Sequence, residues 1–232
     1  MAAKKGQDTI SVTDNRTGKT YEFPIADGTI KATDLRTIKV DDDDFGLMTY
    51  DPAFMNTASC KSAITFIDGD KGILRYRGYP IEELEQARFT EVAFLLIYGH
   101  LPNKQELGAW REKLTRHSLI HEDMKKFFEG FSPNAHPMAI LSAMVASFST
   151  YYSEADDVDL NIVRLLAKAK TVAAFSYKKS IGQPFMYPIN DLSYTENFLH
   201  MMFAVPAEPF VVSPTLDLAL NRTQILLAES EQ

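Results

Sequence analysis

One segment limits the fold of this chain more than any other. Residues 138–152 are apolar almost throughout, and the polar residues among them are small, such as Ser142 and Ser147. Pro137, a residue suited to the first turn of a helix, directly precedes the segment. A helix that is apolar on every side is normally buried. We therefore expect this segment to be an inner helix, surrounded by other helices.

Helical signals continue from Pro80 to the end of the sequence. Residues 81–98 carry apolar residues at helical spacing and are followed by Gly99, a common helix stop. Asn103, with Glu106 after it, predicts a capped helix that runs to about His117. Further helices are expected at 121–128, at 159–179 beginning with Asp159, at 192–203 after an Asp191 cap, and from Ser213-Pro214 onward, where Leu216, Leu220, Thr223 and Leu227 share one face.

The start of the chain has a different pattern. Residues 9–12 and 20–23 alternate apolar and polar around a turn-forming stretch, which predicts a β-hairpin, and residues 29–32 suggest another short strand. A second hairpin is predicted near 63–77. The composition shift near residue 48 divides the chain into a β-rich segment, 1–47, and a helical portion, 48–232, that contains the second hairpin. The expected fold class is mainly α.

The bulk composition excludes several classes of protein. The net charge of −7 and the pI of about 5.3 argue against nucleic acid or an anionic membrane as a partner, because both select for clustered Lys and Arg. Cys60 is the single cysteine, which rules out an internal disulfide and fits a reducing compartment. The sequence shows neither a signal-peptide pattern nor an apolar run of about 18 residues. We expect a soluble, cytoplasmic protein.

Six phrases of the sequence, in the same order, resemble the first half of type II citrate synthase, the kind found in Gram-negative bacteria. They are FMNTASC at 54–60, ITFIDGD at 64–70, YRGYPI at 76–81, AHPM at 135–138, YKKSIGQPF at 177–185, and NDLSY followed by NFLHMMF within 190–203. The similarity extends from about residue 8 to about residue 228. It implies the helical scaffold of the citrate synthase large domain, with the C-terminal half absent.

The resemblance also implies a reaction, the condensation of acetyl-CoA with oxaloacetate to citrate in the tricarboxylic acid cycle. In the family a histidine and an aspartate handle the proton of the acetyl methyl group, a second histidine polarises the ketone, and arginines hold the carboxylates. These residues come later in the family sequence, so no catalytic residue is expected here. The ending ILLAESEQ carries Leu227 and Ser230 where the family motif ILHADHEQ has its two histidines.

Two interpretations follow. In the first, the chain is the N-terminal portion of a citrate synthase and is inactive by itself. In the second, it is a catalytically silent paralogue that acts as an assembly or regulatory subunit of a full-length citrate synthase. Both predict exposed apolar helix faces, and so either a homo-oligomer or a complex with full-length citrate synthase.

Part of the type II family is inhibited by NADH, and the resemblance extends to the residues that contact this effector. The matching positions here are Arg116, His117 and Ser118, together with Tyr152, Arg164 and Lys168. A cluster of cations suits a pyrophosphate. The alternative is that these basic residues only face water, as they usually do on helices.

The remaining histidines and acids have simpler interpretations. His117 and His121 are spaced like metal ligands, but the glutamate of a metalloprotease motif is missing between them, and no metal site is expected. His136 precedes the apolar segment and is interpreted as a helix-entry residue. The acidic run 41–44 lacks the spacing of a calcium loop and is interpreted as a surface turn.

Overall fold

A computed structural model describes residues 8–152 and 157–229, and these form two units, Met1–Ser62 and Ala63–Gln232. The boundary lies later in the chain than the composition shift near residue 48. The hairpin predicted near 63–77 belongs to the second unit. Each unit is described by itself below.

The first unit is built on the predicted hairpin. Strands β1 (Thr9–Asp14) and β2 (Lys19–Pro24) pair antiparallel, with Thr9 opposite Pro24 and Asp14 opposite Lys19. A short 3-10 helix, η1 (Ala32–Thr37), follows. The prediction of a strand at 29–32 is wrong, because Thr29 makes only an isolated bridge to Ala26. Among the described residues of the first unit, the buried apolar ones are Phe23 and Ile38.

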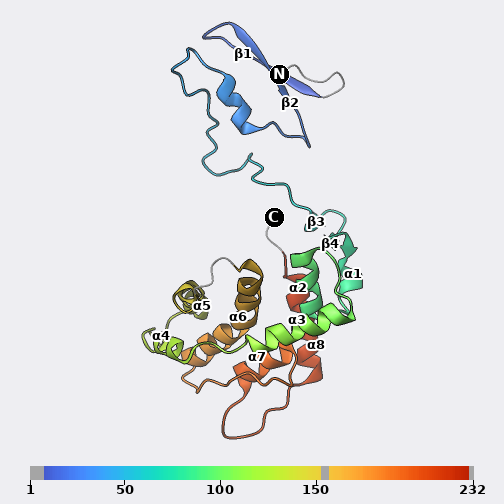
Figure 1. Cartoon of the computed structure of the whole chain (residues 1–232), viewed down its shortest axis with the longest axis vertical. Helices are drawn as coiled ribbons and strands as arrows, with labels where there is room; N and C mark the ends of the chain where they lie inside the picture. The colour runs from blue at the N-terminus through green and yellow to red at the C-terminus, as the bar shows by residue number, and fades with distance from the viewer. Residues whose placement is uncertain (1–7, 153–156, 230–232) are drawn as a thin grey trace. The chain divides into compact units, whose positions relative to one another are not determined.

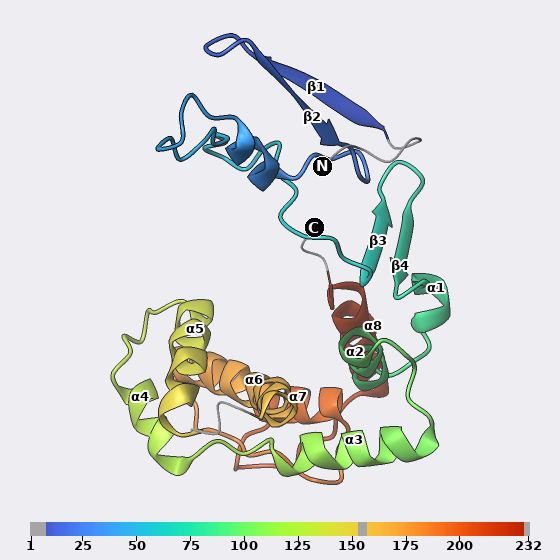
Figure 2. The same cartoon turned by 45° about the horizontal axis from the view of Figure 1, so that its top comes forward.

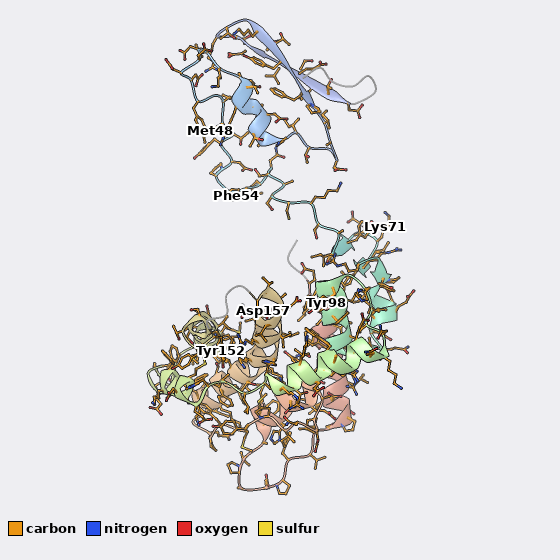
Figure 3. All side chains as sticks on the ribbon, viewed as in Figure 1. Met48, Phe54, Lys71, Tyr98, Tyr152 and Asp157 are labelled. Carbon is orange, nitrogen blue, oxygen red and sulfur yellow. The ribbon has the colours of Figure 1, made fainter. Side chains whose placement is uncertain are left out.

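The acidic run of this unit forms a turn, as the sequence predicted. The Asp41 carboxylate accepts hydrogen bonds from the backbone N–H groups of Asp43 and Asp44, and Asp44 accepts from those of Val40 and Gly46. The carboxylates are thus used to fold their own backbone. After this turn, Met48 and Phe54 leave 67% and 78% of their surfaces exposed (Figure 3).

The second unit is a three-stranded sheet followed by helices (Figure 1). The antiparallel strands are β3 (Thr65–Asp68), β4 (Ile73–Tyr76) and β5 (Tyr79–Pro80). The helices are α1 (Ile81–Leu84), α2 (Phe89–Tyr98), α3 (Lys104–Arg116), η2 (Glu122–Met124), α4 (Lys125–Glu129), α5 (Pro137–Ser147), η3 (Phe148–Thr150), α6 (Val158–Ser180), α7 (Tyr194–Phe203) and α8 (Pro214–Leu226). The mainly α fold class is confirmed.

Local capping signals were predicted well in several places. Gly99 ends α2 in the left-handed conformation with φ +85°, and Asn103 with Glu106 forms the expected capping box of α3. His136 is the N-cap of α5, where its Nδ1 accepts from the Met138 N–H at 3.2 Å. One cap was misplaced, because Ser193 rather than Asp191 caps α7. The helix predicted to begin with Asp159 begins at Val158, and Asp157 caps it.

The single helix predicted for residues 81–98 is divided into α1 and α2. A side chain of α8 explains the division, because Asn221 lies against the break. Its Oδ1 accepts from the Phe89 N–H at 2.8 Å and its Nδ2 donates to the Ala87 carbonyl at 2.9 Å. A residue far along the chain thus satisfies backbone groups that a continuous helix would pair internally.

Helix α8 turns a different face inward from the one predicted. Its buried residues are Asp217, Asn221 and Ile225, whereas Leu216 is 54% exposed and Leu227, just beyond the helix, is 65% exposed. Asp217 accepts hydrogen bonds from Arg88 and Thr195. Pairing of buried polar groups therefore decides the orientation of this helix, against the hydrophobic pattern.

Helix α5 also departs from the prediction of a wholly buried helix. It ends at Ser147 instead of continuing to residue 152, and η3 follows it. Ile140 and Met144 are buried with Phe128, Val172 and Phe175 in one apolar cluster, but Met138 is 61% exposed. In the described structure α5 packs against α6 (Figure 2).

The Asn221 contacts give a test of how α8 holds the unit together. We expect Asn221→Ala to lower the free energy of unfolding by about 2 kcal/mol, because the partly buried Phe89 N–H and Ala87 carbonyl lose their partners. Leu218→Ala, at a 46% exposed position of the same helix, is the control and should cost less than about 1 kcal/mol. Urea unfolding followed by circular dichroism measures both. Equal losses in the two variants would contradict the role given to Asn221.

Candidate functional site

The predicted effector residues meet where α3 ends against α6. The Lys168 Nζ atom donates to the carbonyl of His117 at 2.7 Å and to that of Leu119 at 2.8 Å. The Thr171 hydroxyl donates to the Ser118 carbonyl at 2.7 Å. Carbonyls at the end of a helix lack partners within the helix and carry negative partial charge, so a buried cation is well placed there.

Tyr152 forms the aromatic part of the same cluster. The Lys168 Nζ atom lies 4.7 Å from the centre of the Tyr152 ring, and the Arg164 guanidinium carbon lies 5.3 Å from it. The Tyr152 hydroxyl accepts from the His121 N–H at 3.2 Å. Burial, together with the nearby Arg164, lowers the pKa of Lys168 to about 8. The cluster thus presents two cations against one ring.

Five of the six predicted effector residues lie in this cluster, namely His117, Ser118, Tyr152, Arg164 and Lys168. Arg116 is on the same turn of chain, but its side chain is 72% exposed and pairs with Glu112 at 2.8 Å. Leu227 caps the end of α8. Ser230 lies outside the described residues.

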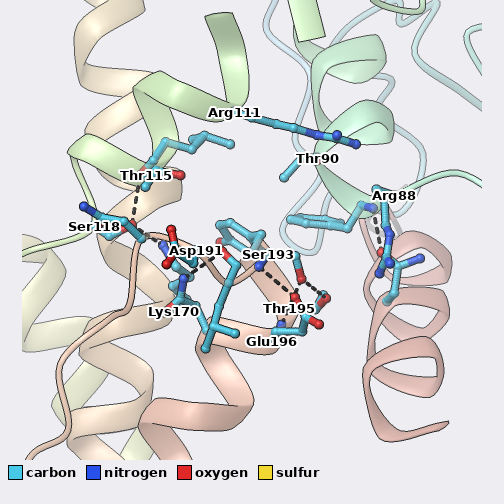
Figure 4. Close-up of a pocket in the computed structure, with 17 residues that line it drawn as sticks. Arg88, Thr90, Arg111, Thr115, Ser118, Lys170, Asp191, Ser193, Thr195 and Glu196 are labelled. Carbon is cyan, nitrogen blue, oxygen red and sulfur yellow. Dashed lines mark hydrogen bonds between the residues drawn. The ribbon is translucent and has the colours of Figure 1, made fainter. Parts of the chain in front are cut away.

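A pocket opens on the other side of the α3 end (Figure 4). Its volume is about 400 Å³, and it is bounded by the start of α2, by α3, by α6 and by residues 190–197, with Asn221 of α8 at one side. Ser118 lines this pocket, whereas Tyr152, Arg164 and Lys168 do not. The pocket and the effector cluster are therefore neighbours that share one residue.

Lys170 is the buried cation of the pocket, and the sequence reasoning missed it. Its Nζ atom donates to the Ser118 hydroxyl at 2.6 Å and to the Ala167 carbonyl at 2.9 Å, and lies 4.7 Å from the centre of the Tyr194 ring. Burial, helped by the Lys168 ammonium, lowers the pKa of Lys170 to about 7. A lysine within a helical pattern gives no signal of this kind, because only packing determines its burial.

The histidines hold local structure. Besides His136, the His121 Nδ1 accepts from the Asp123 N–H, and the His117 Nδ1 lies 2.8 Å from the Lys113 carbonyl oxygen. His100 contacts Glu106 at 3.3 Å, and His200 lies buried on α7. Within residues 8–152 and 157–229, no group of His, Cys, Asp and Glu is arranged to hold a metal ion.

In the described ranges, none of the helices is both long and apolar enough to cross a membrane.

Comparison with known proteins gives consistent matches. Residues 53–232 match the family model described as "Citrate synthase, C-terminal domain". A "Citrate synthase" of Dictyostelium discoideum is 45% identical over 97% of this chain and 47% of its own length. "Citrate synthase 1" of Mycobacterium tuberculosis is 52% identical over 81% of this chain and 45% of its own length.

Solved structures agree with the sequence comparison. The crystal structure of citrate synthase from Pyrobaculum aerophilum superposes with a TM-score of 0.68 at 32% identity, over 77% of this chain and 47% of that one. The chain thus spans about half the length of the curated relatives it matches. The type II subtype stays a prediction.

Lys168 offers a test of the contacts at the α3 end. We expect Lys168→Met to lower the free energy of unfolding by about 2 kcal/mol at pH 7, because two carbonyls lose their donor. The wild-type protein should also gain stability as pH rises from 8 toward 10.5, since unfolded Lys168 keeps its proton over that range and folded Lys168 loses it. The variant should lack that part of the rise.

Urea unfolding at pH 7 and pH 9.5 measures both effects, and Lys179→Met on the same helix is the control. A loss no larger than that of the control would refute the capping role of Lys168. So would an unchanged difference between wild type and variant at the two pH values.

Proposed function

This chain belongs to the citrate synthase family, and from that premise we propose that it supplies helical scaffold for the condensation of acetyl-CoA with oxaloacetate to citrate. We propose further that the 232-residue polypeptide does not carry out this reaction by itself. The observation that carries the second proposal is Leu227. It stands where the resemblance places a substrate-binding histidine, and an aliphatic side chain cannot donate to a ketoacid.

The placement of the histidines supports the same conclusion. His121 and His136 use ring nitrogens to cap helices, and His117 and His100 contact groups of their own segments. A carbon acid such as acetyl-CoA needs a base positioned at its methyl group and a donor at the developing enolate.

The effector cluster supports a finer proposal, that the chain belongs to the type II branch and binds NADH. Two cations and an aromatic ring meet at the α3 end, with Lys168 and Arg164 both within 5.3 Å of the Tyr152 ring centre. A dinucleotide offers a pyrophosphate for the cations and flat rings for stacking. Arg116, exposed on the same turn of chain, is available for a further phosphate contact.

We also propose that the protein assembles with a further copy of itself or with full-length citrate synthase, in the cytoplasm. Exposed apolar side chains on α5 and α8 support an assembly, because burying apolar surface against a partner is favourable. They include Met138, Leu216, Leu218 and Leu226, which are 61%, 54%, 46% and 51% exposed.

The proposed inactivity is tested by a thiol assay. Purified chain mixed with acetyl-CoA and oxaloacetate should release no CoA above the uncatalysed rate, because Leu227 cannot donate to the ketoacid where the family motif has a histidine. The Dictyostelium relative, assayed at the same concentration, is the positive control. Turnover that follows this chain through size-exclusion chromatography would refute the proposal.

NADH binding is tested by calorimetric titration. Arg164→Leu should weaken binding about tenfold, since one charge-assisted hydrogen bond contributes about 1.5 kcal/mol or more. The control is Arg222→Leu on α8, where Arg222 contacts Glu85 at 3.8 Å. Absence of saturable heat with the wild-type chain, or equal affinities of both variants, would contradict the effector proposal.

A further inference from the structure

The pocket beside α3 contains a buried positive charge that is not matched by a negative one. Lys170 is only 5% exposed. Its hydrogen-bond partners are the Ser118 hydroxyl and the Ala167 carbonyl, and within the described chain no carboxylate lies within ion-pair distance of it. Burying an ammonium without a counter-charge is costly. One of its three N–H groups also remains unused by these partners.

Two threonines line the same pocket. Thr90 is 6% exposed and lines the pocket, and its carbonyl is held by the Trp110 Nε1–H at 2.9 Å. Thr115 lines the pocket from α3 (Figure 4). Neither hydroxyl hydrogen-bonds another residue in the described part of the chain. Both side chains are therefore free to donate to a guest molecule, from backbone that is already fixed.

The other charged groups around the pocket are mostly engaged. Arg88 is neutralised by Asp217 at 2.6 Å, and the Glu196 carboxylate accepts from the Ser193 N–H in the capping box of α7. The guanidinium of Arg111 lies 3.8 Å from the carboxylate of Glu91. Asp191 is exposed at the pocket edge. The inner part of the pocket therefore carries the unmatched charge of Lys170.

We propose that this pocket binds a small oxyanion, a carboxylate or a phosphate, held by the Lys170 ammonium and by the hydroxyl groups of Thr90 and Thr115. The anion supplies the counter-charge that the fold leaves out, and the hydroxyls give it hydrogen bonds from two further directions. The site is distinct from the proposed effector cluster, because Tyr152, Arg164 and Lys168 lie outside it. The inference does not depend on NADH binding or on citrate synthesis.

The protonation of Lys170 makes this binding depend on pH. Because the pKa of Lys170 is about 7, Lys170 loses its positive charge as pH rises above neutrality, so affinity for an anion should fall there. Burial raises the pKa of Tyr194, the ring beneath Lys170, so that ring stays uncharged across this range. The other charged groups that face Lys170 or its pocket are Lys168 on the same helix, Arg111 on α3, Arg88 before α2, and Asp191 and Glu196.

The experiment is calorimetric titration of the whole chain with inorganic phosphate and, separately, with succinate, at constant ionic strength and pH 6.5. At least one of the two should bind saturably, and the one that does identifies the class of anion. Affinity should fall about tenfold or more in Lys170→Met and several-fold in Thr90→Val. It should also fall about tenfold for the wild-type chain at pH 8.5.

Two controls separate binding from folding. Lys179→Met removes a lysine from the same helix outside the pocket and should bind like the wild type. Thr90→Ser keeps the hydroxyl and should retain most of the affinity that Thr90→Val loses. Thr90→Val removes no hydrogen bond from the described fold. It therefore tests whether the anion binds in this pocket even where Lys170→Met fails to fold.

The proposal is overturned if neither phosphate nor succinate binds saturably to the wild-type chain. It is also overturned if Thr90→Val and a folded Lys170→Met bind as tightly as Lys179→Met, which would place the anion elsewhere. Equal affinity at pH 6.5 and pH 8.5 would likewise remove Lys170 from the site.

Discussion

Buried lysines on α6 hold the helical unit together. Lys168 donates to the carbonyls that end α3, and Lys178 donates to the Ala204 carbonyl that ends α7 and to Gln183, both at 2.7 Å. Each ammonium thus occupies the negative end of a neighbouring helix, where backbone carbonyls have no partner of their own. These contacts of helix α6 with its two neighbours are made to backbone carbonyls and do not use a carboxylate.

Lys170 also donates to a backbone carbonyl, that of Ala167, and to the Ser118 hydroxyl. It differs from Lys168 in that it also lines the pocket. Lys168 and Lys170, two positions apart on one helix, therefore face different surroundings on the two sides of the α3 end. One side gathers Tyr152 and Arg164 into the proposed effector cluster, and the other faces Thr90 and Thr115. A single helix terminus links the two proposed ligand sites through Ser118.

Much of the polar structure of the helical unit fixes helices relative to one another. Asp217 and Asn221 of α8 join Arg88, Thr195 and the start of α2, and four of the five histidines hold contacts of their own segments. Such groups fix the positions of helices, and their hydrogen-bond donors and acceptors are already used within the fold. Chemistry on a carbon acid requires groups with free donors and acceptors aimed at a substrate.

Local signals in the sequence determined the parts of the fold that neighbouring residues control. The turn after β1, the Gly99 stop and the Asn103 capping box need only a few adjacent residues, and six ordered phrases were enough to indicate the family. The residues of the proposed effector cluster were also selected by that resemblance, although spacing alone would not join Tyr152 to Lys168. Only tertiary structure decided the break before α2, the polar inward face of α8 and the burial of Lys170. In each case a buried polar group takes its partner from a distant part of the chain, and no local pattern encodes that pairing.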